Sequence, residues 1–220
     1  MNPSLSPARD FTPAVPVLAA YDPIIALLTR EKRWRTAMRR QMAPAPGEVI
    51  VDAGCGTGSL LALLGQGEPK ATLIGLDPDT RILAIATDKL RRGGVRADLR
   101  QGYLRDVASL CAGVAVDKIV SSLVFHQVPM AEKRAGLVAM HAALVPGGEI
   151  HIADYGLQRT FAMRALFRMV QWVDGFEDTQ PNADGILPSL MAAAGFADVE
   201  ETQVIPTVTG SISFYRGRKP

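Results

Sequence analysis

Short apolar runs alternate with longer amphipathic stretches along most of the chain. Five of the apolar runs have the length of buried strands and lie at 48–53, 71–77, 95–101, 117–123 and 149–154. Segments with apolar residues every three or four positions predict helices between them, at 59–64, 80–92 and 129–144. Because strands alternate with helices, the pattern predicts βαβ units and therefore a parallel sheet with right-handed crossovers.

The two ends of the chain follow other patterns. Residues 1–16 contain four prolines and predict a loosely packed arm, whereas residues 23–42 have helical spacing with basic residues on the second face. In the last third, the pattern predicts helices at 160–176 and 185–194 and strands at 199–205 and 211–216. The link between these two strands is so short that they are predicted to form an antiparallel hairpin.

Composition changes this picture little, but it excludes several classes of function. Of the 220 residues, 48% are apolar and 21% are charged, which is ordinary for a globular protein. The net charge of +2 and the lack of a Lys- or Arg-rich run argue against a nucleic-acid partner. The two cysteines, Cys55 and Cys111, lack metal-ligand spacing, so no metal site is expected, and a reducing, cytoplasmic location is the simplest interpretation. No signal peptide or membrane span is predicted.

A glycine-rich loop follows the first predicted strand and reads VDAGCGTGS. Gly54, Gly56 and Gly58 allow a sharp turn and a close approach of a ligand to the backbone. A dinucleotide-binding GxGxxG motif counted from Gly54 would need its third glycine where the chain has Ser59. A phosphate-binding P-loop would need a lysine that this loop does not contain. What remains is an acidic residue, Asp52, followed by GxGxG.

The DAGCGTG segment resembles motif I of the class I S-adenosylmethionine-dependent methyltransferases. The resemblance runs from residue 48 to the C-terminus, because 117–123 is similar to motif IV, 144–148 to the turn before strand five, and 192–196 to the segment before the last hairpin. It implies an α/β fold with a Rossmann-like, seven-stranded, mostly parallel sheet, helices on both faces and a C-terminal antiparallel hairpin. It also implies S-adenosyl-L-methionine as the cofactor.

The same resemblance implies a division of the chain. Residues 1–46 would form an N-terminal arm and lid helix, and residues 47–220 the methyltransferase catalytic domain, with a lid insertion at about 156–188. The segment around Tyr21, with Trp34 and Arg35 further on, is similar to the lid helix of the quinone and phospholipid methyltransferase branches.

By this resemblance, the second and third strands end at the nucleoside of the cofactor. Asp77 closes the second strand about twenty residues after the loop, where an acidic residue can accept hydrogen bonds from both ribose hydroxyls, and Pro78 would line the adenine pocket. Many relatives carry an aspartate after the glycine that follows strand three, but this chain has Tyr103 after Gly102. Tyr103 could stack on adenine or hydrogen-bond to it, or Asp106 could replace the missing carboxylate.

Asp52 is expected to be buried beside the loop and to receive the methionine ammonium group, directly or through water. Burial of an unpaired charge costs several kcal/mol, so this carboxylate needs a partner. A small residue such as Cys55 is ordinary in this loop and is not expected to act as a nucleophile. The full set of predicted cofactor-binding residues is Asp52, Ala53, Gly54, Cys55, Gly56, Gly58, Asp77, Pro78, Gly102, Tyr103, Ser121, Ser122 and Leu123.

Two residues are candidates for a catalytic role. His126 follows the fourth strand, beside the expected methyl group, and could act as a general base because histidine titrates near neutral pH; local packing is the alternative. Tyr21 could close over the cofactor or the substrate, or simply pack. Asp154 and Tyr155 end strand five at the same edge of the sheet, where they could orient a substrate or cap the strand.

The resemblance implies a methyltransferase that acts on a small molecule by O-, N- or C-methylation. The acceptor could be apolar, such as a quinone or a phospholipid, because residues 160–176 are rich in Phe, Met, Leu and Trp. Arg159, Arg164 and Arg168 could assist peripheral contact of this segment with a membrane. The alternatives are a protein that binds S-adenosylmethionine without transferring its methyl group, and a nicotinamide dehydrogenase. The chain is expected to be a monomer or a homodimer.

Overall fold

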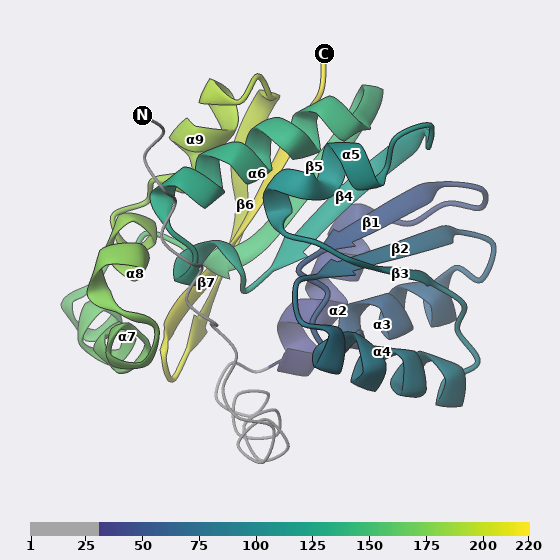
Figure 1. Cartoon of the computed structure of the whole chain (residues 1–220). Coiled ribbons are helices and arrows are strands. Elements are labelled where there is room, and N and C mark those ends of the chain that lie inside the picture. The colour runs from purple at the N-terminus through teal and green to yellow at the C-terminus, as the bar shows by residue number, and fades with distance from the viewer. Residues whose placement is uncertain (1–30) are drawn as a thin grey trace, which may run out of the picture.

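The apolar runs of the sequence form seven strands of one sheet. They are β1 (Val49–Ala53), β2 (Thr72–Asp77), β3 (Asp98–Gln101), β4 (Val116–Ser122), β5 (Leu144–Tyr155), β6 (Ala197–Thr207) and β7 (Gly210–Arg218). In the computed structural model, which describes residues 31–220, their order is β3-β2-β1-β4-β5-β7-β6 (Figure 1). β1 to β5 pair in parallel, whereas β7 runs antiparallel to β5 and β6. The predicted mostly parallel sheet with a C-terminal hairpin is confirmed.

Helices connect the strands. They are α2 (Glu31–Met42), α3 (Ser59–Gly67), α4 (Thr80–Arg92), α5 (Val107–Leu110), α6 (Met130–Ala143), α7 (Phe161–Asp174), α8 (Phe176–Ala183) and α9 (Leu187–Ala193), with short 3-10 turns η1 (Leu104–Asp106) and η2 (Phe125–Gln127). The helices α5 and α8 were not predicted, and the other helices lie at the predicted places. Within residues 31–220, no helix has the length and apolarity needed to cross a bilayer. The predicted arm, Tyr21 and the first part of the predicted helix over 23–42 lie outside the described residues.

Two differences from the prediction have a clear backbone cause. The helix expected over 160–176 is found as α7 and ends at Asp174, because Gly175 has φ +90°, a conformation through which a helix cannot continue, and α8 follows as an additional helix. The turn expected over 144–148 is instead the beginning of β5. Gly147 adopts φ +82° there, and the register of β4 against β5 shifts between Val116 and Lys118, so the extra residues are absorbed as an irregularity of the strand.

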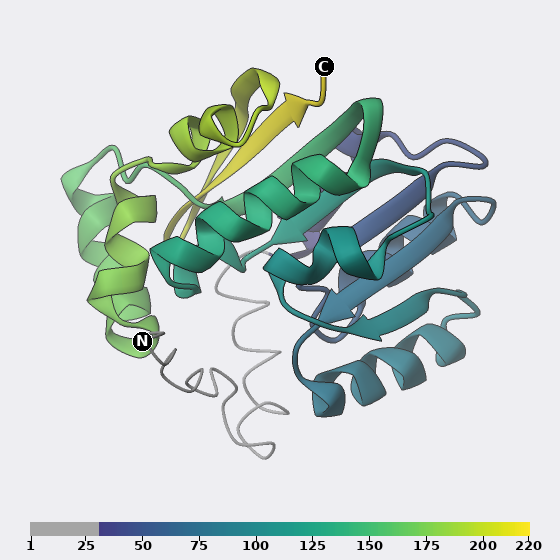
Figure 2. The same ribbon diagram turned by 45° about the horizontal axis from the view of Figure 1, so that its top comes forward.

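The sheet separates two apolar clusters, because successive residues of a strand point to opposite faces. Ile50 packs in the cluster that contains the buried residues of α2, α3 and α4, whereas Val51 packs in the cluster that contains those of α5, α6 and α9. Figures 1 and 2 show these two sets of helices on opposite sides of the sheet. Both faces of the parallel strands are therefore covered, as such sheets require.

The strand order reverses at β1, and this reversal positions the candidate site. β2 and β3 lie on one side of β1, and β4 and the remaining strands lie on the other. Asp52, near the carboxyl end of β1, is in register with Gly75 of β2 and Val120 of β4. The ends of β1, β2 and β4 therefore meet at one edge of the sheet, which is where open α/β sheets bind their ligands.

α2 belongs to the core, although it precedes the first strand. Its residues Trp34, Met38 and Met42 have at most 1% of their surface exposed. They pack with Leu60 and Leu61 of α3 in the same cluster. The boundary at residue 46 between an N-terminal segment and a catalytic domain stays a prediction.

We expect Met38→Ala to lower the free energy of unfolding by about 2–5 kcal/mol, because it leaves a cavity under α2. Lys32→Ala, on the exposed side of the same helix, is the matched control and should change stability by no more than about 0.5 kcal/mol. Urea denaturation of both variants checks this, and equal small effects would show that α2 does not contribute to the core in solution.

Candidate functional site

The loop after β1 turns through three glycines in the left-handed region of backbone space. The φ angle is +81° at Gly54, +52° at Gly56 and +75° at Gly58, values that other residues rarely adopt. A Cβ atom on Gly54 would collide with the side chain of Val124, from the loop after β4. By contrast, a Cβ on Gly56 would meet no described atom within 4 Å. The loop is packed at Gly54 and leaves room for a ligand beside Gly56.

Asp52 is a fully buried carboxylate at the end of β1. Among residues 31–220, neither of its oxygens has a hydrogen-bond partner. Burial raises the pKa of Asp52 to about 7, the positive charge of Arg35 opposes this rise, and the negative charge of Asp77 adds to it. A buried acid without hydrogen bonds is costly, so Asp52 is suited to receive a cation from a ligand.

Arg35, which the resemblance placed only in the segment similar to the lid helix, acts on Asp52, and the sequence did not predict this. It lies on α2, where its Nε is 2.6 Å from Glu31 Oε1, and its charge acts on Asp52 from outside the sheet. In the sequence it is one of several basic residues on an amphipathic helix. Its place beside Asp52 depends on how α2 packs against the sheet, which no local pattern reveals.

Asp77 joins the loops that follow β1 and β2. Its Oδ2 accepts a hydrogen bond from Gly56 N at 3.1 Å, and its Oδ1 accepts one from Asp79 N at 3.0 Å. Burial raises the pKa of Asp77, and these two backbone hydrogen bonds oppose that rise. The carboxylate predicted for ribose recognition is thus held against the glycine loop.

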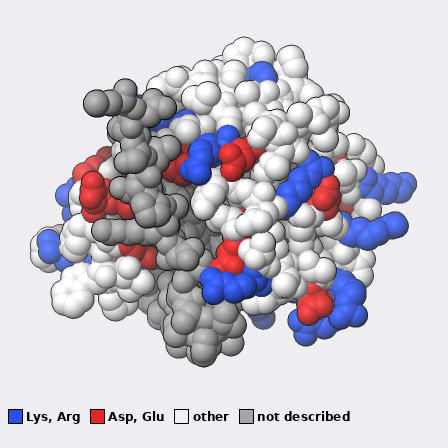
Figure 3. Space-filling model, in the orientation of Figure 1, with Lys and Arg blue, Asp and Glu red and all other residues white. Residues whose placement is uncertain are grey.

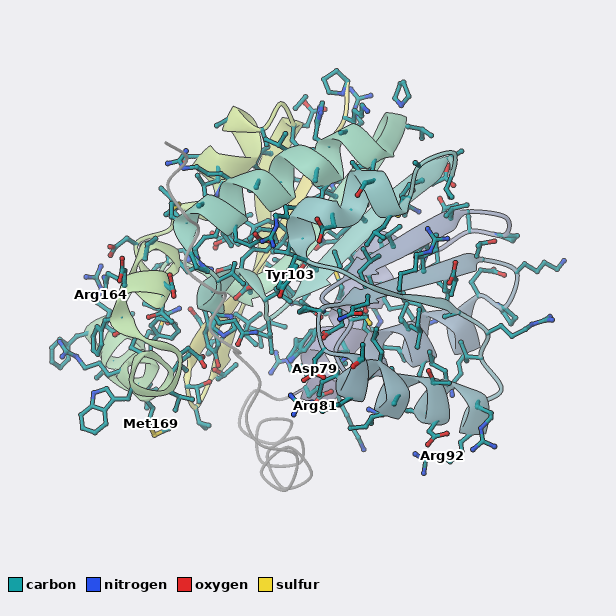
Figure 4. The ribbon with its side chains drawn as sticks, in the orientation of Figure 1. Asp79, Arg81, Arg92, Tyr103, Arg164 and Met169 are labelled. Carbon is teal, nitrogen blue, oxygen red and sulfur yellow. The ribbon has the colours of Figure 1, made fainter. Side chains whose placement is uncertain are left out.

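The end of β3 is tied to the end of β2. Gly102 N donates to Asp77 O at 3.2 Å, and the Gln101 side chain donates to Pro78 O at 3.0 Å. Tyr103 follows with a side chain that is 40% exposed, and Figure 4 shows it at the same edge of the sheet as Asp79. The predicted residues Pro78, Gly102 and Tyr103 therefore lie close to Asp77.

Of the two candidates for the adenine contact, Asp106 has a structural partner. Its Oδ2 accepts a hydrogen bond from Tyr103 N at 2.9 Å and closes the first turn of η1. The Arg105 guanidinium stacks on the Tyr103 ring at 4.3 Å from the ring centroid. Both candidates therefore have a partner within the protein, and the adenine contact stays a prediction.

β4 ends against the glycine loop. Ser121 is fully buried, and its hydroxyl donates to Ala53 O at 2.7 Å. Ser122 is half-buried, and Leu123 has φ +56°, a conformation that costs free energy for a residue of its size. Leu123 N donates to Ala153 O at 2.9 Å, which anchors the strained residue to β5.

Cys55 and Cys111 are buried free thiols. Burial raises the pKa of the Cys55 thiol, and the charges of Asp52 and Asp77 raise it further. The thiol therefore stays protonated, and a protonated thiol is a poor nucleophile. This agrees with the expectation that Cys55 is a small loop residue rather than a reactive one.

His126 lies in η2 and bridges two carboxylates. Its Nδ1 is 2.7 Å from Asp154 Oδ1, and its Nε2 is 3.3 Å from Asp174 Oδ2 at the end of α7. The ring also stands edge-on to Tyr155, with 5.0 Å between ring centroids. The side chain is buried, so both polar atoms of the ring are engaged within the protein.

These carboxylates set the charge of His126. Burial lowers the pKa of the imidazole, but Asp154 and Asp174 outweigh it and raise the pKa to about 9. At neutral pH the ring is a cation that donates from both nitrogens, and such a ring has no lone pair with which to accept a proton. The arrangement favours the structural alternative for His126 over the general base.

Asp154 organises the loop after β4. One oxygen, Oδ2, accepts from Val124 N at 2.9 Å and from Phe125 N at 2.7 Å. The other, Oδ1, faces His126 and also accepts from Tyr155 N at 2.7 Å. Every oxygen of this buried carboxylate therefore has two partners, which makes it a support for the loop.

Lys133 of α6 is another functional neighbour that the sequence did not indicate. It is fully buried, and its Nζ donates to Phe125 O and, at 2.9 Å, to Asp178 O. Burial lowers its pKa to about 8, although Asp154 and Asp178 act in the opposite direction. On an amphipathic helix a lysine is normally solvated, so its burial follows from the tertiary packing of η2 and α8.

The ion pairs of His126 with Asp154 and Asp174 should make the free energy of unfolding depend on pH. Because the folded pKa of about 9 lies above the ordinary 6.5, the stabilisation is fully present below about pH 6.5 and is lost as the pH rises through about 9. Its size is on the order of 3 kcal/mol. We expect the stability difference between the wild type and His126→Gln to shrink by that order over this range in urea denaturation.

Asp174→Asn serves as the control for this prediction. In this variant the stabilisation by His126 should be lost at a lower pH than in the wild type, because the imidazolium keeps only Asp154 as its anionic neighbour. A stability difference between wild type and His126→Gln that is constant from pH 6.5 to pH 9 would mean that His126 is not held as a cation.

The comparisons with known proteins agree with this geometry. A family model described as a methyltransferase domain matches residues 50–148, which include the glycine loop, Asp77 and the end of β4. A demethylmenaquinone methyltransferase from Clavibacter sepedonicus is 27% identical over 225 residues, which cover 93% of this chain and 87% of that protein.

Solved structures share the fold. An O-methyltransferase family protein from Burkholderia thailandensis has a TM-score of 0.75 at 18% identity, over 95% of this chain and 61% of its own. The magnesium protoporphyrin IX methyltransferase from Synechocystis PCC 6803, solved with bound SAH, has a TM-score of 0.66 at 18% identity, over 87% of this chain and 83% of its own.

The coverage of the relatives is uneven. The chain spans 61% of the Burkholderia structure. It spans only 25% of an uncharacterized protein from Synechococcus sp., to which it is 36% identical over 108 residues.

Proposed function

We propose that this chain, which belongs to the class I S-adenosylmethionine-dependent methyltransferases, transfers the methyl group of S-adenosylmethionine to a small-molecule acceptor. The observation that carries the proposal is the buried carboxylate of Asp52, which has no hydrogen-bond partner among the described residues. A ligand cation at this point would offset the cost of its burial. The methionine ammonium of the cofactor is such a cation.

The surroundings of Asp52 fit the remaining parts of the cofactor. The Arg35 guanidinium, whose charge acts on Asp52, suits the methionine carboxylate. Each oxygen of Asp77 accepts one backbone hydrogen bond, and a carboxylate oxygen has capacity for a second, so ribose hydroxyls can donate there. The space beside Gly56 admits a ligand at the backbone.

The other predicted contacts remain part of this proposal. They lie on the loops after β1 to β4, around Asp52 and Asp77, and comprise Ala53, Gly54, Cys55, Gly58, Pro78, Gly102, Tyr103, Ser121, Ser122 and Leu123. Tyr21 also stays a predicted catalytic contact, outside the described residues.

When bound, the cofactor supplies a methyl group on a positively charged sulfur, which is already activated for displacement. The task of the chain is therefore to align the reactants and keep water out. Asp154 contributes by fixing the loop after β4 through two backbone amides. His126, held as a cation between Asp154 and Asp174, links that loop to α7. We assign His126 a positioning role in place of proton abstraction.

The acceptor we propose is a small apolar molecule, such as a quinone or a phospholipid. By its name, the Clavibacter relative acts on demethylmenaquinone. α7, which carries exposed aromatic residues, is joined to the site by Asp174 and lies where an apolar acceptor would approach. O-, N- and C-methylation are all compatible with these residues. A cytoplasmic location, peripheral membrane contact and a monomeric or homodimeric state stay predictions.

The proposal is tested by incubating the purified chain with methyl-labelled S-adenosylmethionine and either a quinone-rich lipid extract or an aqueous metabolite extract. We expect label in a product of the lipid extract. Tight cofactor binding without label in any fraction would support a cofactor-binding protein that does not transfer methyl groups. Tight binding of NAD in calorimetry would support a dehydrogenase and contradict the proposal.

Asp77→Ala should weaken the binding of S-adenosylhomocysteine by about 1–3 kcal/mol, because ribose hydrogen bonds are lost. Asp98→Ala is the matched control, since Asp98 lies at the opposite end of the neighbouring strand β3. Calorimetry measures both, and unchanged affinity in Asp77→Ala would mean that the ribose lies elsewhere.

The pKa of Asp52 predicts how cofactor affinity depends on pH. With a pKa of about 7, Asp52 takes up a proton as the pH falls below 7 and no longer attracts an ammonium group. The dissociation constant of S-adenosylhomocysteine should rise by up to about tenfold per pH unit between pH 7 and pH 5. Asp52→Asn should bind weakly at every pH, and a wild-type affinity that is flat over this range would contradict the pairing.

A further inference from the structure

The outward side of α7 is apolar and exposed. Phe161 and Trp172 have 88% and 84% of their surface exposed, and Val173 and Met169 have 69% and 57%. At the helical angle of about 100° per residue, these four side chains fall on one half of the helix. Large contiguous apolar surfaces of this kind usually mark a site of contact with another molecule or a membrane.

The inward side of α7 contains both apolar and polar groups, and Val170 packs there against the core. Phe167 is buried there, beside Gln171, whose side chain donates to Gln180 Oε1 at 2.9 Å. Asp174 also faces inward and pairs with His126. A helix on the surface of a water-soluble domain normally places its apolar face inward and its polar face outward. α7 departs from this rule on its outward side, where large apolar side chains stand beside Arg164 and Arg168, so its sequence favours an amphipathic, interfacial environment there.

The exposed charges of α7 are positive. Arg164 and Arg168 are both exposed, and Asp174, the remaining charged residue of the helix, is engaged inside. Arg164 also donates from Nε to Gln158 O at 2.9 Å, which restrains its guanidinium group. Figure 3 shows a mainly white surface over α7 with both basic and acidic side chains beside it, and Figure 4 places Arg164 and Met169 at this end of the molecule.

The turn between β6 and β7 packs against the inward side of α7, at the buried Phe167. A Cβ atom on Gly210 would lie 3.3 Å from Phe167 Cβ, so the turn of the hairpin lies directly beside α7 (Figure 1). Val208 in this turn is 48% exposed. The hairpin therefore supports α7 from its inward side and adds one exposed apolar residue near it.

We propose that this surface, formed by the outward side of α7 and Val208, rests on a bilayer that contains anionic lipids. Phe161 and Trp172 would enter the boundary between headgroups and acyl chains, and Arg164 and Arg168 would meet lipid phosphates. α7 has 14 residues, about 21 Å of helix, which suits a helix that lies in the membrane surface. A symmetric contact with a second copy would bring the same arginines together, and α7 itself has no exposed acidic residue to pair with them.

The purpose of this membrane contact rests on the proposed function, whereas the vesicle experiment that tests the contact does not depend on it. Asp174, in the last turn of α7, pairs with His126 beside the candidate site. A surface docked through α7 would therefore hold the site next to the lipid phase. An acceptor dissolved in the bilayer would then reach the site without crossing water.

Tryptophan fluorescence offers a direct probe. The chain has two tryptophans, of which Trp34 is fully buried and Trp172 is 84% exposed. Vesicles of phosphatidylcholine mixed with phosphatidylglycerol should shift the emission of the wild type to the blue and pellet the protein. Vesicles of phosphatidylcholine alone should do so less, and added salt should weaken the effect.

Variants locate the contact. Phe161→Gln combined with Trp172→Gln should reduce vesicle binding by at least about tenfold. Arg168→Glu should reduce it severalfold with the mixed vesicles only. Val138→Gln on α6 is the control, because Val138 is also an exposed apolar residue (57%) but lies on another helix, and its variant should bind like the wild type.

Three results would overturn the proposal. The first is the absence of both an emission shift and pelleting with vesicles, and the second is an equal loss of vesicle binding in the α7 and Val138 variants. The third is a tryptophan emission that shifts with protein concentration in the absence of vesicles, which would assign the surface to a second copy. Calorimetry with S-adenosylhomocysteine on the same proteins separates this proposal from the proposed function. A chain that binds vesicles but no S-adenosylhomocysteine would keep the membrane surface and lose the proposed function.

Discussion

The reversal of strand order at β1 is the constraint on which the site depends. Because β2 continues the sheet on one side of β1 and β4 on the other, the chain must cross over after β3, and the ends of these strands meet at one edge. This geometry brings Asp52, Asp77 and Ser121 together from segments that are far apart in the sequence. The glycine loop, in turn, lets the backbone turn sharply enough to leave that edge accessible.

Two buried carboxylates at this edge differ in their hydrogen bonding. Asp154 is saturated by backbone amides and His126, so it stabilises the loop after β4 and has no capacity left for a ligand. Asp52 is equally buried but has no hydrogen-bond partner among the described residues. Since a buried polar group without partners costs free energy, this contrast is our reason for proposing Asp52 as the ligand-binding group and Asp154 as the support of the loop.

Much of the fold and part of the site could be predicted from the sequence. The seven strands follow from short apolar runs, and Asp52, Asp77 and the glycines follow from their spacing, because these features are local. Arg35, Lys133 and Asp174 could not be found in this way, because each acts on a residue from another element. The same holds for His126, whose charge is decided by carboxylates of β5 and α7. Gly175 can be read from the sequence, but no local pattern indicates that α7 ends at this residue.

The central claim, that Asp52 binds the ammonium group of the cofactor, is tested most directly by a thermodynamic cycle. Calorimetry would compare S-adenosylhomocysteine with 5′-methylthioadenosine, which lacks the amino-acid portion, on the wild type and on Asp52→Asn. We predict that the preference of the wild type for S-adenosylhomocysteine falls by at least about tenfold in Asp52→Asn, while the affinity for 5′-methylthioadenosine changes little. An equal preference in both proteins would contradict the account.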